Sequence, residues 1–318
     1  MNTQCIVTTT IQKPQPALYK LLSFKEWDII LAGDTKTPEE DYRKLEMEYS
    51  NFKYISIKEQ DGMDSTLSAL IGWRCIQRRN MALLYAYRKN QYKVIGTFDD
   101  DNIIYDSWDG TTLVGKDVKI NEFTTTLPAL DPFKVIGLDY HHRGYPLTYI
   151  HQRDSEDVIF NGQKLINVGI EVPIPEGDPD IDAITRIMKA PDLSVKQVHK
   201  ELTLPFTSDK IMPFNSQCTF VRADLIPHYM MLVDVGRHDD ILGAYLLQKM
   251  TGAKVVFSKP IAKQIRNEHD LTVDMSKEIF GYCNSAKFIE ASDPFTIVSE
   301  KCKAAFERYN MSMKKEYV

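Results

Sequence analysis

The sequence has few cysteines and no arrangement of them that would hold a metal. Its five thiols are Cys5, Cys75, Cys218, Cys283 and Cys302. They lie far apart and form no C-x-x-C pair, so a zinc module of the common Cys/His kind is excluded. An odd number of scattered cysteines also argues against a disulfide framework. We expect reduced, buried thiols in a cytoplasmic protein.

Long apolar runs and an excess of basic residues are also missing. No stretch approaches the roughly 20 apolar residues that span a bilayer, and the first residues lack the basic start and apolar run of a signal peptide. The formal net charge is -5 and the pI is about 5.9. Neither value favours binding to a nucleic-acid backbone or an anionic membrane. The sequence therefore predicts a cytoplasmic protein with no integral membrane segment and no nucleic-acid partner.

What is present is the composition of an ordinary globular protein, with 43% hydrophobic and 26% charged residues in 318. In the first hundred residues, short apolar runs alternate with amphipathic stretches. This pattern is typical of strand-helix repeats in a largely parallel sheet. The expected strands are residues 5–8, 27–32, 54–57 and 92–98. A helix carrying Met81, Leu84 and Tyr85 at helical spacing is expected before the last of them.

The rest of the chain divides into an irregular middle and a more regular end. Frequent prolines between residues 106 and 205 predict loops and short strands laid over the sheet, where acceptor recognition is common. Later elements are expected as strands at 218–221 and 254–257, a helix from Asp239 to Gly252, and a helix at 295–309. We predict one α/β domain of residues 1–318, with a single mixed, mostly parallel sheet flanked by helices. Its nucleotide-binding half, residues 1–106, would pack against an acceptor-binding half with C-terminal helices, residues 107–318.

An acidic triplet, Asp99-Asp100-Asp101, directly follows the strand predicted at 92–98 and gives an Asp-x-Asp motif. In an extended backbone, Asp99 and Asp101 would project to one side and Asp100 to the other. Two convergent carboxylates at the carboxyl end of a strand suit a hard divalent cation, which can neutralise a diphosphate leaving group. The alternative is a solvated acidic turn. The position after a strand of an α/β unit favours metal binding, because ligands gather at such ends.

Polar residues near the ends of the other predicted elements indicate a nucleotide site. Thr8 and Thr9 follow the first strand, and Asp34 and Thr35 follow the second; they could take the base and ribose, or form ordinary turns. Arg79 and Asn80 begin the predicted helix, where a guanidinium and a helix N-terminus can share a diphosphate. The alternative there is a solvated basic helix face. Asp99 and Asp100 would lie beside the same donor.

Three later segments carry candidate catalytic or metal-binding side chains. Arg143 precedes a Gly-x-Pro turn and could contact an anionic sugar or phosphate. Asp239 and Asp240 open a predicted helix, where one can deprotonate an acceptor hydroxyl, Asp240 being the candidate base; a plain helix cap is the alternative. His269 follows a late strand and could complete the coordination of the cation, or lie in a surface loop.

Seven motifs in order resemble the STELLO-type glycosyltransferase domain. They are Gly33-Asp34-Thr35-Lys36-Thr37-Pro38, Arg79-Asn80 with Leu84-Tyr85-Ala86, Asp99-Asp100-Asp101-Asn102, Arg143-Gly144-Tyr145-Pro146-Leu147, Ser216-Gln217-Cys218-Thr219, Asp240-Ile241 and Arg266-Asn267-Glu268-His269. Their order is also similar to that in the reversibly glycosylated polypeptides, the UDP-arabinopyranose mutases. Those proteins carry Gly-Arg-Tyr-Asp-Asp where this chain has Gly236-Arg237-His238-Asp239-Asp240.

The resemblance implies a type-A glycosyltransferase fold, a nucleotide-diphospho-sugar donor that is UDP-linked, and Mn²⁺ or Mg²⁺ on Asp99 and Asp101. The predicted function is sugar transfer to a glycan or another hydroxyl acceptor. In the mutase branch, the arginine that matches Arg143 becomes reversibly glycosylated, so a UDP-sugar mutase is one alternative. An aspartyl-phosphate phosphohydrolase and a catalytically silent nucleotide-sugar binder are two others from different classes.

Overall fold

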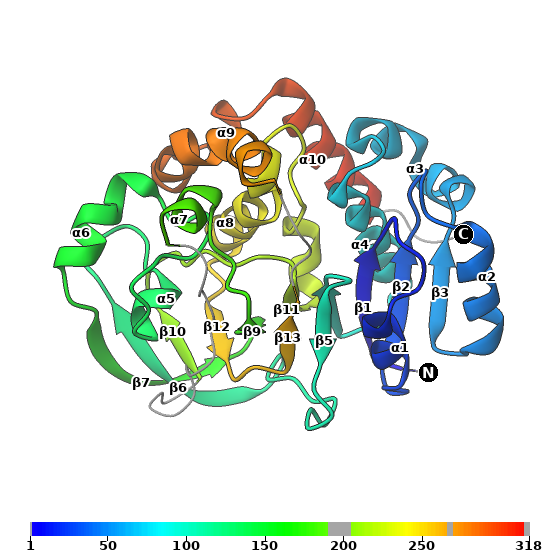
Figure 1. Ribbon diagram of the computed structural model, residues 1–318, viewed down its shortest axis with the longest axis horizontal. Coiled ribbons are helices and arrows are strands. Elements are labelled where there is room, and N and C mark those ends of the chain that lie inside the picture. The colour runs from blue at the N-terminus through cyan, green and yellow to red at the C-terminus, as the bar shows by residue number, and fades with distance from the viewer. Residues whose placement is uncertain (1, 190–204, 266–269, 315–318) are drawn as a thin grey trace.

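A ten-stranded mixed sheet in the order β3-β2-β1-β4-β11-β8-β12-β10-β6-β7 forms the centre of the molecule (Figure 1). The computed structural model describes residues 2–189, 205–265 and 270–314. A second sheet of three short strands, in the order β5-β13-β9, joins the chain after β4 to later segments. Helices flank the large sheet, so the structure confirms the predicted α/β class with a mixed, mostly parallel sheet.

The strands of the large sheet are β1 (Gln4–Thr9), β2 (Asp28–Ala32), β3 (Phe52–Ile55), β4 (Val94–Phe98), β6 (Asp117–Thr124), β7 (Ile159–Asn167), β8 (Ile170–Pro173), β10 (Phe206–Ser208), β11 (Cys218–Arg222) and β12 (Val255–Ser258). Those of the small sheet are β5 (Asn102–Ile104), β9 (Glu176–Gly177) and β13 (Ala262–Gln264). The α-helices are α1 (Pro16–Leu22), α2 (Glu39–Glu48), α3 (Ile57–Ile71), α4 (Arg79–Arg88), α5 (Pro132–Val135), α6 (Ile150–Ser155), α7 (Ala183–Lys189), α8 (Asp239–Thr251), α9 (Leu271–Glu290) and α10 (Glu300–Met313). Two short 3-10 turns, η1 (Ile76–Arg78) and η4 (Gly236–His238), lead into α4 and α8.

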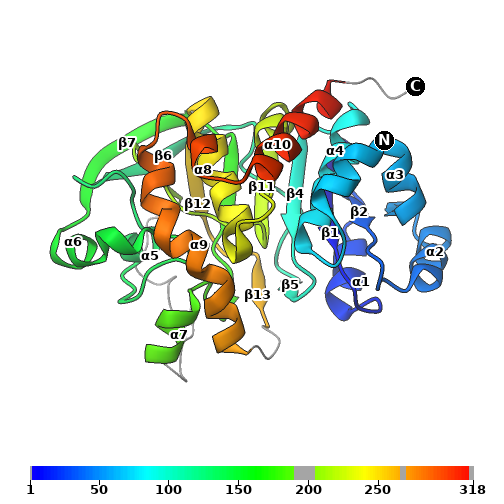
Figure 2. The same ribbon diagram turned by 90° about the horizontal axis from the view of Figure 1, so that it is seen from above.

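The parallel strands β3, β2, β1 and β4 are buried on both faces. Side chains alternate along a strand, so Ile6 of β1 packs in one apolar cluster while Cys5 and Val7 pack in the other. The first cluster takes in residues of α1 and α2, and the second takes in residues of α3, α4, α8 and α10. Figure 2 shows α8, α9 and α10 on the side of the sheet that α4 also covers.

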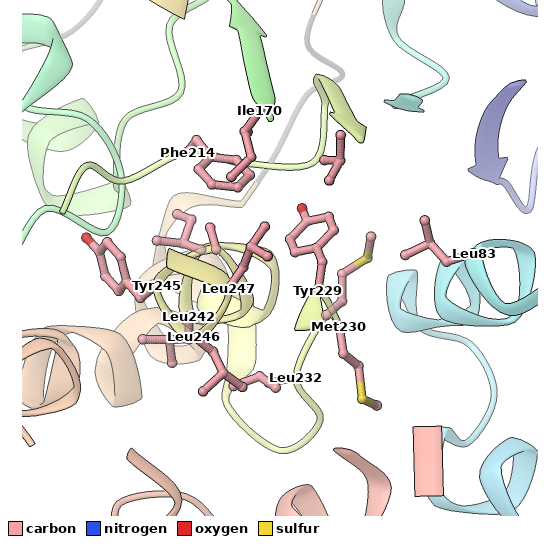
Figure 3. Close-up of a cluster of buried hydrophobic side chains, with 14 of the residues drawn as sticks. Leu83, Ile170, Phe214, Tyr229, Met230, Leu232, Leu242, Tyr245, Leu246 and Leu247 are labelled. Carbon is pink, nitrogen blue, oxygen red and sulfur yellow. The ribbon is translucent and has the colours of Figure 1, made fainter. Parts of the chain in front are cut away.

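Helix α8 lies in the middle of the larger cluster (Figure 3). Every residue from Asp239 to Gln248 is buried, which is the behaviour of a helix surrounded by protein on all sides. Leu242 and Leu246 pack there with Leu232, from the loop that precedes η4. The helix ends at Gly252 in the left-handed conformation, with φ of +67°, as predicted. This burial fixes the position of its first turn, which carries two aspartates.

The predicted strands β1, β2, β4, β11 and β12 are confirmed within a few residues, whereas the third strand is displaced. It spans Phe52–Ile55, not residues 54–57, because Ser56 is the N-cap of α3. Ser56 Oγ accepts from the Glu59 backbone N–H at 3.2 Å, and Glu59 Oε2 accepts from the Ser56 N–H at 2.8 Å. This reciprocal capping box begins a helix where the apolar pattern alone continued the strand.

The middle of the chain is more regular than predicted. Strands β6 and β7 form a long antiparallel pair at one end of the sheet itself, so the prediction of loops and short strands laid over the sheet is wrong there. The 20-residue helix α9 was not predicted at all. The last helix begins at Glu300, capped by Ser299 Oγ, and not at residue 295.

All five cysteines are free, but Cys283 is exposed on α9, contrary to the expectation of buried thiols. None of the helices in the described part of the chain has the length and apolar character needed to cross a bilayer.

Candidate functional site

A cavity of about 520 Å³ lies where β1 and β4 end and β11 begins. It is lined by Thr9, Cys75, Ile76, Gln77, Arg79, Asp99, Asp100, Asp101, Arg143, Asp180, Ser216, Gln217, Gly236, Arg237, Asp239, Asp240, Gln264 and Lys277. Strands β1 and β4 are parallel, and β11 runs antiparallel to β4 with Cys218 opposite Phe98. The residues before β11 therefore meet the residues after β4 at one edge of the sheet. The Asp99 backbone N–H donates to the Gln217 carbonyl at 3.0 Å across this junction.

The acidic triplet lies in a turn and not in an extended segment. The Asn102 N–H donates to the Asp99 carbonyl at 3.4 Å as the chain reverses into β5. The backbone is therefore not extended across the triplet, and all three residues line the cavity. Asp100 Oδ2 accepts from Thr10 Oγ1 at 2.5 Å, and Gln264 Nε2 lies 3.5 Å from Asp101 Oδ2.

Arg79 is fully buried beneath the triplet, at 0% exposure. Its Nη2 donates to Asp99 Oδ1 at 2.5 Å, and its Nη1 donates to the carbonyl and the hydroxyl of Ser216 at 3.0 and 2.9 Å. Burial raises the pKa of the Asp99 carboxyl, and the nearby Arg79 guanidinium offsets this only in part. Arg78 is equally buried, with its guanidinium 3.7 Å from the centre of the Trp73 ring. The alternative of a solvated basic helix face is therefore excluded.

The two aspartates of α8 have different surroundings. Asp240 Oδ2 accepts from the backbone N–H and the hydroxyl of Ser216 at 2.9 and 3.1 Å, and its Oδ1 lies 3.5 Å from Arg143 Nη2. Asp239 Oδ2 accepts from Gln77 Nε2 at 3.0 Å. Burial, and next the charge of Asp240, raise the pKa of the Asp239 carboxyl to about 7. A carboxyl that titrates near neutral pH in a cavity is a candidate for proton transfer.

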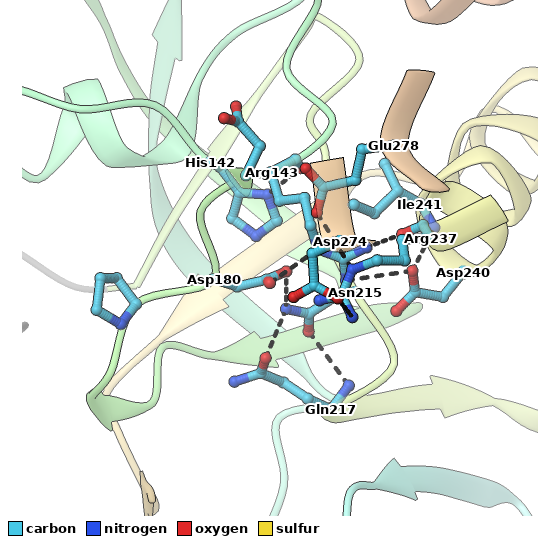
Figure 4. A network of polar contacts seen from close by, with 12 residues as sticks. His142, Arg143, Asp180, Asn215, Gln217, Arg237, Asp240, Ile241, Asp274 and Glu278 are labelled. Carbon is cyan, nitrogen blue, oxygen red and sulfur yellow. Dashed lines mark hydrogen bonds and ion pairs between the residues drawn. The ribbon is translucent and has the colours of Figure 1, made fainter. Parts of the chain in front are cut away.

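Arg143 lies at the centre of a buried polar network (Figure 4). Its Nε donates to Asp180 Oδ1 at 2.8 Å, and its Nη1 donates to the Arg237 carbonyl. Burial lowers the pKa of the Arg143 guanidinium, but the charges of Asp180 and Asp240 outweigh burial and hold that pKa well above its ordinary value. Asp180 also accepts from Asn215 Nδ2 at 2.6 Å. The network connects the loop before η2 (Leu147–Tyr149) to the start of α8.

Four of the predicted site residues that the structure describes do not line this cavity. Asn80 is buried, and its amide bonds to the Met231 backbone at 2.8 and 2.9 Å. Asp34 is buried, and it accepts from the backbone N–H groups of residues 74 and 75. Thr35 is exposed beside Asp34, and Thr8 lines a much smaller neighbouring cavity that also touches Asp99 and Asp100. His269 lies outside the described residues.

The structure adds cavity residues that the sequence did not single out. They include Gln77, Asp180, Gln264 and Lys277. They come from η1, from a loop, from β13 and from α9, and no motif marks them individually. Only their contacts in the folded chain bring them to the acidic triplet.

The donor set of the cavity suits a hard cation. Six carboxyl groups line it, those of Asp99, Asp100, Asp101, Asp180, Asp239 and Asp240, against four cationic side chains. Within the described residues, no group of three or more His, Cys, Asp or Glu side chains is arranged to hold a metal ion. Mg²⁺ is commonly bound through one or two carboxylates together with substrate phosphates. The chemistry of Asp99 and Asp101 fits a site of that kind, in which phosphate oxygens supply further ligands.

Two glycines allow η4 to pack closely against α9. Gly236 has φ of +67°, and a Cβ built there would lie 1.9 Å from the Lys277 carbonyl oxygen. A Cβ on Gly281 of α9 would lie 2.2 to 2.4 Å from atoms of the His238 ring. The close approach of the two segments therefore depends on the absence of side chains at both positions.

We expect Gly236→Ala to lower the free energy of unfolding by about 1–3 kcal/mol more than Gly252→Ala does, because forced overpacking costs about that much. Gly252 is a matched control, since it has the same φ of +67° and a Cβ added there would meet no atom within 4 Å. Urea denaturation of the two variants measures the difference. Equal losses would show that the η4–α9 contact tolerates a methyl group.

No protein-family model and no curated protein matches the chain. Among solved structures, the chain is similar to a mannosyltransferase from Pyrobaculum calidifontis in complex with GDP-Man and Mn²⁺, at 10% identity and a TM-score of 0.43, over 95% of this chain and 73% of that one. It is also similar to glucosyl-3-phosphoglycerate synthase from Mycobacterium tuberculosis in complex with phosphoglyceric acid, at 10% identity and a TM-score of 0.44, over 92% and 82% of the two chains. The resemblance to the STELLO and mutase families stays a prediction.

Proposed function

We propose that the chain is a metal-dependent glycosyltransferase of the type-A fold. It would move a sugar from a nucleotide-diphospho-sugar, UDP-linked, to a glycan or another hydroxyl acceptor. The observation that carries this proposal is a single cavity with an acidic triplet on one wall and, on another, a carboxyl whose pKa is raised to about 7. These are the two requirements of the reaction: stabilisation of a diphosphate leaving group and removal of a proton from the acceptor.

The donor side of the site consists of Asp99, Asp101 and Arg79. A bound Mn²⁺ or Mg²⁺, held by Asp99 and Asp101, would neutralise charge on the departing diphosphate. Arg79 fixes Asp99 through the 2.5 Å contact and is itself fixed by Ser216. Since Arg79 is fully buried, its contribution is to orient the carboxylate and to add positive charge beneath it.

We assign the role of general base to Asp239 in place of Asp240. Both oxygens of Asp240 already accept hydrogen bonds or face Arg143. Within the described residues, Asp239 accepts a hydrogen bond from one side chain, that of Gln77, besides the backbone N–H groups of Asp239 and Asp240, and its pKa of about 7 suits proton abstraction near neutral pH. Asp240 would then orient the Ser216 segment and raise the basicity of its neighbour.

The surroundings of Arg143 favour transfer over the mutase alternative. To accept a sugar, a guanidinium must lose its proton and turn a nitrogen toward the donor. Here Asp180 and Asp240 hold the Arg143 pKa well above its ordinary value, against the effect of burial, and its nitrogens already face Asp180, the Arg237 carbonyl and Asp240. We therefore propose that Arg143 maintains the cavity wall and is not glycosylated.

Donor binding in the presence and absence of metal tests the proposal. A ligand that binds only the folded state raises its Tm, so we expect one nucleotide-sugar of a UDP and GDP panel to raise Tm only with Mn²⁺ or Mg²⁺. Asp101→Asn should weaken that binding tenfold or more, or roughly 1.4 kcal/mol. Asp106→Asn is a matched control, because its side chain is 97% exposed and pairs with Lys20 outside the cavity.

Two outcomes would contradict the proposal. One is equal stabilisation by the donor in EDTA and in Mn²⁺, which would show that donor binding needs no metal. The other is an unchanged donor affinity in Asp101→Asn, which would show that the acidic triplet takes no part in donor binding.

A further inference from the structure

Gln77 reaches the candidate base from a distant part of the sequence. It lies on η1, is partly buried, and lines the cavity. Its Nε2 donates to Asp239 Oδ2 at 3.0 Å, across 162 positions of the chain. Among the described residues, no other side chain donates a hydrogen bond to the Asp239 carboxyl. The contact therefore joins the predicted nucleotide-binding half to the first turn of α8.

The segment that carries Gln77 is held on both sides. Before it, Asp34 accepts from the backbone N–H groups of Arg74 and Cys75 at 2.9 and 3.1 Å. Arg74 has φ of +61°, a conformation that a non-glycine residue keeps only where its surroundings enforce it. After it, the buried Arg78 donates to Gln60 Oε1 at 2.9 Å and to the Gly72 carbonyl at 3.3 Å. With both flanks fixed, the Gln77 amide is oriented before any substrate binds.

We propose that Gln77 is a positioning residue that orients the Asp239 carboxylate for proton abstraction from the acceptor. This inference rests on the proposed function, in which Asp239 is the base. A donated N–H stabilises the ionised form of a carboxyl group and fixes the direction of its remaining lone pairs. Gln77 therefore favours the ionised form of Asp239 against the effect of burial, and it fixes the direction in which the carboxylate faces the cavity.

Other charged groups also act on Asp239, and they stay in place when Gln77 is changed. Asp240 follows it on α8 and raises its pKa, while Arg143, from the loop before η2, lowers it. Arg79 of α4, Arg237 of η4, Lys277 of α9 and the acidic triplet line the same cavity. No hydrogen bond joins Gln77 to these groups. Replacing Gln77 by an apolar side chain of similar size therefore tests the contribution of its amide alone.

The test is the pH dependence of kcat/KM for Gln77→Leu, using the donor found by the Tm screen. A hydrogen bond to a charged group contributes enough to move a pKa by about one unit, so we expect the acidic limb of the profile to move up by about one pH unit. At pH 6.5 this would lower kcat/KM about tenfold, with recovery to within about threefold at pH 9. The KM for the donor should not change. Gln77→Glu, which places a second carboxyl beside Asp239, should move the limb at least as far.

Gln91→Leu is the matched control, because the Gln91 amide lies 3.4 Å from an Asp28 carboxylate oxygen, away from the cavity. An acidic limb that stays in place in both Gln77 variants would overturn the proposal. So would an equal loss of activity at every pH together with a weaker donor KM, since that would place Gln77 in donor binding. Full activity in Asp239→Asn would instead show that Asp239 is not the base. That failure of the proposed function is distinguishable from a failure of the Gln77 proposal, because it is measured without any Gln77 variant.

Discussion

Replacing Asp239 by asparagine should slow sugar transfer by about 10²- to 10⁴-fold, the usual contribution of a general base. Asparagine keeps the size and the hydrogen-bonding oxygen of the side chain, so Gln77 keeps its partner, but it cannot take a proton from the acceptor. Donor binding should not change, because the donor is held by the acidic triplet. Steady-state kinetics, together with Tm shifts on donor binding, separate the two effects.

The same variant should be more stable than the natural protein at pH 8 and equally stable at pH 4. The Asp239 pKa is raised to about 7 by burial and by Asp240, whereas an aspartate in an unfolded chain titrates near pH 4. Between those values the folded state binds more protons than the unfolded state, so stability falls as pH rises, and the loss is complete above about pH 7. Asparagine has no proton to lose and avoids this loss. Tm measured across the range tests the sign.

Asp41→Asn is the matched control for both measurements, since Asp41 lies in the first turn of α2 and does not line the cavity. Transfer at the natural rate in Asp239→Asn would rule out Asp239 as the base. Loss of donor binding together with turnover would instead place Asp239 on the donor side. Donor binding without measurable transfer by the natural protein is what the catalytically silent alternative requires.

Replacing Arg79 by leucine should lower the free energy of unfolding by about 3 kcal/mol, because removing one partner of a buried ion pair leaves a charge without compensation. Arg79 is fully buried, and its loss also removes the donors to the Ser216 carbonyl and hydroxyl. Asp99 keeps 31% of its side chain exposed in the cavity, so water moderates the effect. Donor binding should weaken as well, since Asp99 loses its orientation. Urea denaturation measures the stability change.

Two comparisons make the Arg79 result specific. Arg222→Leu breaks an exposed pair with Asp224, so it should cost about 1 kcal/mol or less. Combining Arg79→Leu with Asp99→Asn should recover part of the lost stability, because the unpaired charge is then absent. If Arg79→Leu loses no more stability than Arg222→Leu does, the Arg79–Asp99 ion pair does not stabilise the cavity.

The location of the site could be predicted because it follows from strand direction. Parallel strands end at one edge of a sheet, so polar residues at or directly after the ends of β1 and β4 had to lie near each other. That reasoning placed Asp99, Asp101 and Thr9 correctly at the cavity. It failed for Asp34, which also follows a strand, because its carboxylate binds the backbone at Arg74 and Cys75. Position along the chain does not tell whether a turn carboxylate faces a ligand or its own backbone.

The parts that were not predicted depend on tertiary contacts. Helix α9 packs on η4 and α8, and its sequence combines exposed apolar residues such as Ile279 with buried acidic ones such as Glu278, which obscures the helical pattern. The buried acids are explained by tertiary partners: Arg237 pairs with Asp274 and Glu278, and Glu278 also accepts from the Ala183 backbone N–H at 2.8 Å. In the same way, the difference between Asp239 and Asp240 arises from Ser216, Arg143 and Gln77. Adjacent identical residues cannot be told apart without their partners.

The cavity lies between the two predicted halves of the chain, and its opposite walls belong to different halves. The acidic triplet and Gln77 come from the first hundred or so residues, while Asp239, Ser216 and Arg143 come from the rest. A displacement of one wall by about 1 Å can change a rate about a hundredfold, because reacting groups must meet within a narrow range of distance. Turnover would then report on how rigidly the β4–β11 junction joins the halves, so a substitution far from any substrate could slow the reaction by loosening that junction.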